Sequence, residues 1–187
     1  PRHLALWKWH KLRVMGWLMS LETVDMDADG DLDILYTDRK GKLNGAYWLE
    51  NRRSENAGKR WREHLIGVKG REAMFLCRAD LDQDGLEDVI VATRPKEMVI
   101  CRRLNRAGTS WREHVIPIPS RAGDAKAPAV ADFDGDGRNE IIFTTERAEQ
   151  KEGVCRLVPR GDMGGKWEMK PVSGIDGVKH DLIELLD

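Results

Sequence analysis

A nine-residue acidic pattern occurs three times in this chain of 187 residues, with steps of 55 and 52 residues between copies. Each copy reads Asp-x-Asp-x-Asp-Gly-x-x, followed by Asp or Glu, and the copies begin at Asp25, Asp80 and Asp132. A further step of 55 residues reaches Asp187, the last residue. Self-similarity at a fixed period is typical of repeat architectures, in which each unit buries its apolar face against its neighbours. The chain is therefore predicted to consist of units of about fifty residues.

A tryptophan marker keeps the same register as the acidic pattern. The segments Trp61–His64 and Trp111–His114 share the sequence Trp-Arg-Glu-His and begin 19 and 21 residues before the second and third acidic copies. Trp7 and Trp167 lie at similar distances before Asp25 and Asp187. Two independent markers in one register make the repeat secure. We expect these tryptophans to pack between neighbouring units, since large aromatic side chains dominate such cores.

Each unit is predicted to form four short strands. In the second unit these cover residues 73–79, 88–93, 98–104 and 111–116, and the segment after each acidic copy is rich in β-branched residues. Helices are poorly supported, because Gly and Pro interrupt the short periodic stretches. Four strands per unit, repeated radially, form the blade of a β-propeller.

This pattern predicts an all-β chain that forms one partial β-propeller domain over residues 1–187. We expect complete four-stranded blades at about 21–66, 73–116 and 127–172, with 1–20 and 173–187 belonging to incomplete neighbouring blades. Within those ends, residues 7–14 are interpreted as a last strand and residues 180–187 as a first strand. Because propellers typically close with 4 to 8 blades, the rest of a longer propeller is the expected partner of these edges.

The acidic copies are predicted to be Ca²⁺ loops. Gly at position 6 permits a sharp turn that directs alternate carboxylates to one point, and a flexible ring of hard oxygen ligands suits Ca²⁺ better than Mg²⁺. An EF-hand is excluded, because its position 12 needs a Glu, whereas Tyr36, Val91 and Phe143 stand there. The alternative is an ordinary Asp-rich turn. About three sites are expected, with the ligands at positions 1, 3, 5 and 9: Asp25, Asp27, Asp29, Asp33, Asp80, Asp82, Asp84, Asp88, Asp132, Asp134, Asp136 and Glu140.

Composition excludes several classes of protein. Lys and Arg (31) nearly balance Asp and Glu (32), so no nucleic-acid partner is indicated. No apolar run approaches the ~20 residues of a membrane-spanning helix. The three cysteines, Cys77, Cys101 and Cys155, form no disulfide framework and have no zinc-site spacing, so we expect small buried residues.

The acidic loops followed by aliphatic strands resemble the FG-GAP/VCBS repeats of the integrin α-chain type of β-propeller. The Trp-x-x-His segments and the segment Trp48–Asn51 are similar to bacterial VCBS-repeat proteins in particular. The resemblance implies a seven-bladed propeller that is extracellular, periplasmic or on the cell surface, with calcium between the first and second strands of a blade. The Phe-Gly and Gly-Ala-Pro signatures of such repeats are not spelled out in this sequence.

The resemblance also indicates a second face. Ligands of such propellers usually bind opposite the calcium loops, where charged residues could bind a carboxylated sugar or perform acid–base chemistry on one. The alternative is an ordinary charged rim. The candidates are Arg71, Glu72, Asp124, Lys126, Lys179, His180 and Asp181.

The family includes adhesion modules, sugar-binding domains and some polysaccharide lyases, so the fold alone does not choose a function. We expect a calcium-stabilised extracellular binding module for a carbohydrate or protein ligand, in which calcium is structural and no residue is catalytic. One alternative is a polysaccharide lyase or other sugar-active enzyme that uses a Lys or His base on the second face. Another is a purely architectural repeat of a larger surface protein.

Overall fold

The computed structural model describes residues 7–52, 61–161, 164–175 and 177–185, and these residues contain twelve strands and no helix. The first sheet comprises β1 (Leu18–Val24), β2 (Asp33–Asp38), β3 (Gly45–Asn51) and β4 (Trp61–Gly67). The second comprises β5 (Glu72–Ala79), β6 (Asp88–Arg94), β7 (Glu97–Arg103) and β8 (Trp111–Pro117). The third comprises β9 (Asp124–Ala131), β10 (Glu140–Glu146), β11 (Val154–Arg160) and β12 (Lys166–Pro171).

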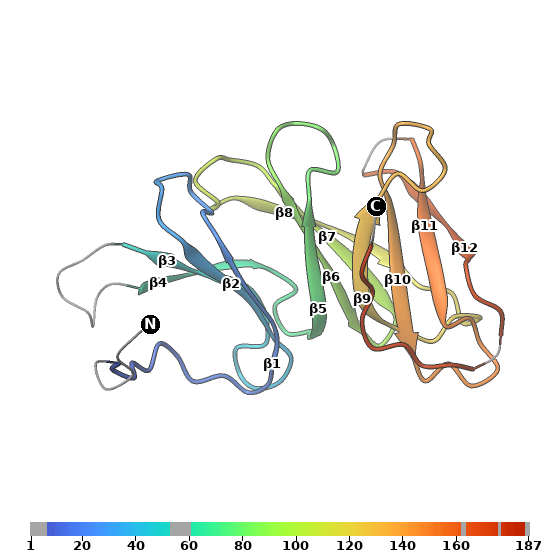
Figure 1. Cartoon of the computed structure of the whole chain (residues 1–187), viewed down its shortest axis with the longest axis horizontal. Coiled ribbons are helices and arrows are strands. Elements are labelled where there is room, and N and C mark those ends of the chain that lie inside the picture. Colours follow the sequence, from blue (N-terminus) through green and yellow to red (C-terminus); the bar gives the residue numbers. More distant parts are fainter. Residues whose placement is uncertain (1–6, 53–60, 162–163, 176, 186–187) are drawn as a thin grey trace.

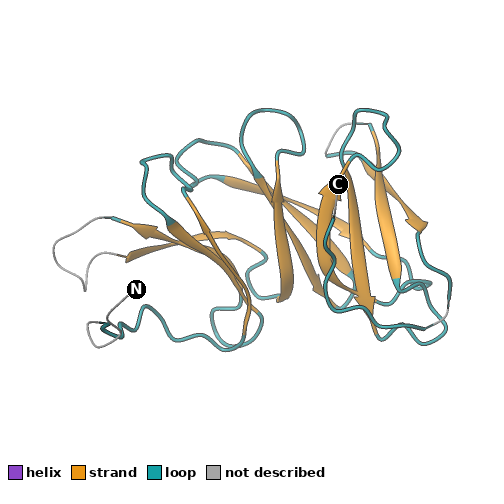
Figure 2. Ribbon diagram, in the orientation of Figure 1, coloured by secondary structure: helices purple, strands orange, loops and turns teal. Residues whose placement is uncertain are grey.

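Each sheet is an antiparallel meander in which strands pair in sequence order. The three sheets stand side by side along one row, each presenting a face to the next (Figure 1). Strands and loops account for the whole described chain (Figure 2). The all-β prediction is confirmed: the sheets are blades of a propeller-like fold that does not close within this chain.

Burial explains why the second strand of each unit is the most apolar. Every residue of β6 and β10 except the last is buried, because these strands lie in the middle of their sheets and are covered on their faces. Such strands read as continuous runs of Val and Ile rather than as an alternating pattern. The fourth strands β4 and β8 lie at sheet edges, and their shared Arg-Glu pair is exposed.

Two apolar clusters join the sheets. One lies between the first and second sheets and includes Leu35, Trp48 and Val91, while the other lies between the second and third and includes Ile90 and Phe143. All five side chains are at most 1% exposed. Because each sheet contributes to a core that it shares with its neighbour, a single sheet would leave its apolar face in water.

The recurring tryptophans follow this arrangement only in part. Trp61, Trp111 and Trp167 are half-buried and pack against the apolar clusters, as expected. The prediction that Trp7 packs between neighbouring units was wrong, because its side chain is 67% exposed. Trp48, which the sequence marked only as part of a family-like segment, is the largest fully buried side chain.

The strand expected at residues 7–14 is not formed. A strand needs a neighbour for its backbone N–H and C=O groups, and none of the described strands pairs with this segment. Instead, the Arg13 guanidinium lies over the rings of Tyr36 and Tyr47, at 5.2 and 4.8 Å from their centroids. The Asp38 carboxylate then accepts hydrogen bonds from the backbone N–H groups of Gly16 and Trp17. These residues cover the outer face of the first sheet.

The strand expected at residues 180–187 is also absent over its described part, residues 180–185, for the same reason; residues 186 and 187 lie outside the described residues. The C-terminal segment instead runs along the third sheet (Figure 1). The backbone of Val178 lies against Gly153, where an added Cβ would come within 2.5 Å of the Val178 carbonyl oxygen. Lys126 on β9 forms an ion pair with Asp181.

Candidate metal centres

The acidic loops occupy equivalent places in the three sheets. We name them loop 1 (residues 25–33), loop 2 (80–88) and loop 3 (132–140), and each connects the first strand of its sheet to the second. Side-chain amides join the last two loops: Asn139 donates to the Asp80 carbonyl oxygen and Gln83 donates to the Gly137 carbonyl oxygen, at 3.4 and 3.5 Å. The repeat therefore places loops 2 and 3 next to each other at one end of the sheets.

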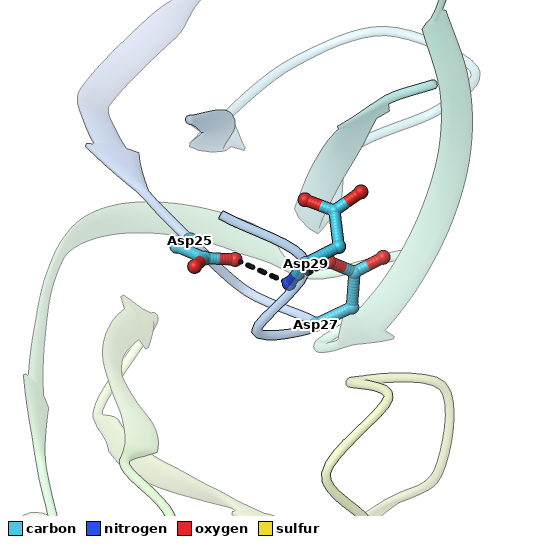
Figure 3. A group of neighbouring side chains, drawn as sticks. All are labelled: Asp25, Asp27 and Asp29. Carbon is cyan, nitrogen blue, oxygen red and sulfur yellow. Dashed lines mark hydrogen bonds between the residues drawn. The ribbon is translucent and has the colours of Figure 1, made fainter. Parts of the chain in front are cut away.

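In every loop the carboxylates at positions 1, 3 and 5 converge. One oxygen from each side chain can be chosen so that all three lie within 4.8 Å of one another. Figure 3 shows this group in loop 1, where Asp25, Asp27 and Asp29 project from a single turn of backbone. The same grouping recurs for Asp80, Asp82 and Asp84, and for Asp132, Asp134 and Asp136.

The carboxylate at position 1 organises each turn. Asp25 accepts a hydrogen bond from the backbone N–H of Asp29 at 3.1 Å, which Figure 3 shows, and another from the N–H of Gly30 at 3.0 Å. Asp80 and Asp132 accept the equivalent bonds at positions 5 and 6 of their loops. The carboxylate at position 5 in turn accepts from the N–H at position 7 in all three loops. These bonds explain why the alternate carboxylates face one point.

The backbone of the loops is left-handed at two positions. Position 6 is Gly in each copy and has φ between 84° and 87°. Position 4 has φ of 62° at Ala28, 59° at Gln83 and 72° at Gly135. A side chain in this region is strained, whereas Gly adopts it freely. Gly therefore stands at position 6 in all three loops, where it avoids this strain, but at position 4 only in loop 3.

The acids at position 9 lie apart from these groups. Asp33, Asp88 and Glu140 begin the second strands and are each 1% exposed. Asp33 accepts hydrogen bonds from the N–H groups of Met26 and Asn51, at 2.9 and 2.8 Å. Glu140 pairs with Arg156 at 2.9 Å. The structure thus brings together nine of the twelve expected ligands and places the other three at the base of the loops.

Asp88 differs from the other two acids at position 9. Its Oδ1 accepts a hydrogen bond from the Arg103 N–H at 2.8 Å, and the backbone N–H of Leu81 is a second donor to its buried carboxylate. Burial raises the pKa of this carboxyl to about 6, and the negative charges of Asp82 and Asp84 raise it further against the effect of its backbone hydrogen bonds. A cation bound in the loop would neutralise the negative charges that raise this pKa.

Negative charge accumulates in loop 1 as well. Desolvation raises the pKa of Asp27, and the charges of Asp29, Glu50 and Asp25 add to it. Desolvation also raises the pKa of Asp33. Like charges held together in this way disfavour ionisation unless a cation neutralises them. Hard carboxylate oxygens in a turn fit Ca²⁺, so the residues present fit the ion that the sequence indicates.

The loops differ in their basic neighbours. In loop 2, the Arg102 guanidinium forms ion pairs with Asp82 and, at 3.7 Å, with Asp84. In loop 3, Arg138 at position 7 pairs with Asp136 at 2.6 Å and lowers the pKa of that exposed carboxyl. Arg156 also approaches Asp134 at 3.7 Å. The contacts of Arg102 and Arg156 depend on strand register, so the sequence pattern did not indicate them, whereas Arg138 stands within the pattern itself.

Charged side chains at the ends of the second strands and in the early part of the first strands form a chain of alternating sign, which we call the rim network. Arg39 pairs with Glu72 at 3.2 Å, Glu72 lies 3.9 Å from Arg94, and Arg94 pairs with Glu146 of the next sheet. Glu146 in turn lies 3.9 Å from Lys126. Through Lys126 the network continues to the C-terminal segment.

The structure separates the seven residues expected on this second face into groups. Arg71 pairs with Glu97 and Glu113, at 3.3 and 2.9 Å, away from Lys126. Asp124 lies 3.5 Å from Arg147 and 3.8 Å from Lys96.

At the C-terminal end, Lys179 pairs with Asp181 at 3.0 Å, and His180 has its ring near Gly153. Glu72, Lys126 and Asp181 are thus members of the rim network or of its C-terminal extension.

Sequence reasoning missed Arg39, Arg94 and Glu146, which carry the rim network between sheets. A signal was present, because each stands fourteen residues after the first Asp of its loop and therefore shares the repeat register. A cavity of about 260 Å³ lies beside the network, lined by Glu72, Arg94, Pro95, Asp124 and Arg147. Its lining presents both signs of charge.

Comparison with known proteins gives one family. Residues 80–143, from the start of loop 2 into β10, match the family described as FG-GAP-like repeat. The match does not distinguish the VCBS type. No match was found among curated proteins. The described residues include no helix of the length and apolar character needed to cross a membrane.

Proposed function

We propose that this chain, which carries an FG-GAP-like repeat, is a calcium-stabilised interaction module in which calcium has a structural role. Repeats of this family are typical of extracellular or surface proteins and serve as interaction modules. We place the protein outside the cytoplasm on that basis, at the cell surface, in the periplasm or in the extracellular space. A carbohydrate or a protein is the proposed ligand class.

One observation carries the proposal: three equivalent loops repeat the same carboxylate geometry. A single Asp-rich turn is common without a metal. Here, the carboxylates at positions 1, 3 and 5 converge in all three loops, and in each loop the position 1 carboxylate accepts a hydrogen bond from the Gly N–H at position 6. The surrounding residues vary freely, so the shared geometry points to a shared requirement of the loops themselves.

The proposed role of calcium is to hold neighbouring sheets together. Met26, at position 2 of loop 1, is 2% exposed, and its side chain lies against Gly108 in the turn between β7 and β8. The Trp48 indole N–H donates to the Gly108 carbonyl oxygen at 2.9 Å. A bound ion that fixes loop 1 would therefore fix a contact between the first two sheets.

The expected stabilisation follows from mass action. If Kd is on the order of 10⁻⁴ M, as in extracellular modules, about 1 mM Ca²⁺ adds roughly 1.4 kcal/mol per site. Three sites together would contribute roughly 4 kcal/mol, which is comparable with the whole stability of a small domain.

The rim network favours a binding or architectural role over catalysis on the second face. A general base must reach its substrate in the unprotonated form. Lys126, the lysine best placed for such a role, has a side chain only 9% exposed, forms an ion pair with Asp181 and lies 3.9 Å from Glu146, so it is enclosed by the network rather than open to a substrate. We therefore do not put forward a sugar-active enzyme as a second function.

Thermal unfolding in calcium, magnesium and chelator tests the proposal. We expect 1 mM Ca²⁺ to raise Tm by several degrees over the chelated protein, and Mg²⁺ at the same concentration to have a much smaller effect. Replacing Asp27 and Asp29 together with Asn should remove part of the calcium-dependent increase. Glu184→Gln, which removes an exposed acid outside the loops, is the matched control. An equal increase in Tm with Ca²⁺ and Mg²⁺ would contradict the proposal. So would a full calcium-dependent increase in the variant with Asn at positions 27 and 29.

A further inference from the structure

The Arg102 guanidinium lies against two of the loop 2 carboxylates that are proposed to bind Ca²⁺. Arg102 belongs to β7, the strand that pairs with the β6 strand leaving the loop. Its guanidinium forms an ion pair with Asp82 and lies 3.7 Å from Asp84, so one cation serves two carboxylates of the converging group. The side chain therefore neutralises loop 2 from within the protein.

The first sheet has an acid in the equivalent place. Val89 pairs with Cys101 in the second sheet and Ile34 pairs with Leu49 in the first, so Arg102 and Glu50 follow at the same register position. Glu50 accepts a hydrogen bond from the His64 ring at 2.7 Å, if that nitrogen carries a proton, and its charge acts on Asp27. Loop 1 thus has an additional negative neighbour where loop 2 has a positive one.

Arg102 compensates the charge of loop 2 without completing its hydrogen bonds. Within the described residues, its Nε is buried and forms no hydrogen bond of normal geometry, and the same holds for both Asp82 carboxylate oxygens. Asp88, which is 1% exposed at the base of the loop, is held by the backbone N–H groups of Arg103 and Leu81. Asp82 Oδ2 faces the Arg102 Nε as an ion pair, which leaves Asp82 Oδ1 as a buried oxygen without a hydrogen bond within the described residues. Such oxygens are rare in folded proteins, and an ion bound in the loop would supply the missing partner.

The structure also offers Arg102 another position. A cavity of about 240 Å³ is lined by Arg102 and Asp88 on one side and by Arg112, Glu113 and His114 of β8 on the other. The Arg102 side chain is 39% exposed, and an arginine has several rotatable bonds, so its guanidinium can leave the loop for this space or for water.

We propose that Arg102 is an internal counter-ion that occupies loop 2 in the absence of metal and is displaced when Ca²⁺ enters. Loop 2 consequently binds Ca²⁺ more weakly than loop 1, and the module loads its sites in a fixed order. This inference rests on the proposed calcium role of the loops. It adds that the affinity of one loop is set by a residue of the neighbouring strand.

Amide NMR of the intact chain tests this proposal one loop at a time. The N–H groups of Gly30 and Gly85 are bound by the position 1 carboxylates of their loops, so each reports its own site during a titration with CaCl₂. We expect the Gly30 signal to shift at a lower Ca²⁺ concentration than the Gly85 signal. In Arg102→Gln, the midpoint at Gly85 should fall about tenfold, the size expected when a screened unit charge at ion-pair distance is removed. The midpoint at Gly30 should not change.

Arg112→Gln is the matched control, because Arg112 pairs with Arg102 across the strands and is exposed. It removes the same charge from the same strand pair and should leave the Gly85 midpoint within twofold of the wild type. The proposal is overturned if Gly85 responds together with Gly30, or if both variants change the Gly85 midpoint equally. If neither amide responds to Ca²⁺, the proposed function fails as well, so the two failures are distinguishable.

Discussion

Asp88→Asn should have opposite effects with and without calcium. The substitution preserves the shape of the side chain and the oxygen that accepts the Arg103 N–H, but it removes a buried negative charge. Without calcium, that charge destabilises the fold, because burial raises the pKa of Asp88 from 3.8 to about 6. With calcium, the same charge would favour the bound ion. The variant should therefore be more stable than the wild type in chelator and should gain less from calcium.

The magnitude follows from the pKa shift. One pKa unit corresponds to about 1.4 kcal/mol, so at pH 7 the ionised carboxyl of Asp88 costs about 3 kcal/mol. In a chain of this length, 1 kcal/mol changes Tm by about 2–4 °C, which predicts an increase of roughly 6–12 °C in chelator. The cost is absent below the unfolded pKa of 3.8, grows as pH rises, and is complete above about 6. The advantage of the variant should therefore be large at pH 7.5 and nearly lost at pH 4.

Thermal unfolding at both pH values, in chelator and in 1 mM Ca²⁺, measures these effects. Glu140→Gln is the informative control, because Glu140 occupies the same loop position but is paired with Arg156. Removing that charge breaks a buried ion pair and should lower Tm in chelator. A lower Tm for Asp88→Asn in chelator at pH 7.5, or an equal change at pH 4, would refute the reasoning.

Three other predictions concern the loops, the core and the cysteines. Gly135→Ala should lower the free energy of unfolding by about 1–2 kcal/mol, because a φ of 72° strains any residue with a side chain. An added Cβ meets nothing within 4 Å there, so the effect comes from the backbone alone. Gly174→Ala is the control and should change Tm little, because Gly174 is also in open space but has no positive φ. Trp48→Phe should lower the free energy of unfolding, measured in urea, by about 1–3 kcal/mol. The substitution removes an indole N–H that donates to the Gly108 carbonyl oxygen, and it leaves a cavity at a position where the native side chain is 1% exposed. Burial raises the pKa of Cys77 to about 12, so a thiol reagent at pH 8 should label Cys77 in urea and not in the folded protein. Equal rates of labelling in urea and in the folded protein would contradict this prediction.

The sequence was sufficient to predict the features that depend on local pattern. The acidic loops converge as expected because alternation and Gly at position 6 act within nine residues, and Gly30 and Gly85 adopt the left-handed backbone that the turn needs. The strand order within each unit was also predictable, because a meander with short turns leaves few alternatives.

Features that depend on neighbours were not predictable in this way. Residues 7–14 carry the composition of a strand, but a strand forms only where a partner completes its hydrogen bonds, and Arg13 instead packs on two tyrosine rings. Arg102 reaches Asp82 only because β6 and β7 pair in one particular register. A shift of that register by one residue would turn the guanidinium to the other face of the sheet.

The number of calcium ions bound per chain tests the central claim most directly. Equilibrium dialysis against a range of CaCl₂ concentrations, with the metal content measured by elemental analysis and folding followed by circular dichroism, gives that number for the intact protein. The account predicts a value that approaches three at saturation, and that falls by one when Asp132, Asp134 and Asp136 are all replaced by Asn. A folded chain that binds no calcium at millimolar concentrations would show that the three loops are Asp-rich turns, and would contradict the account.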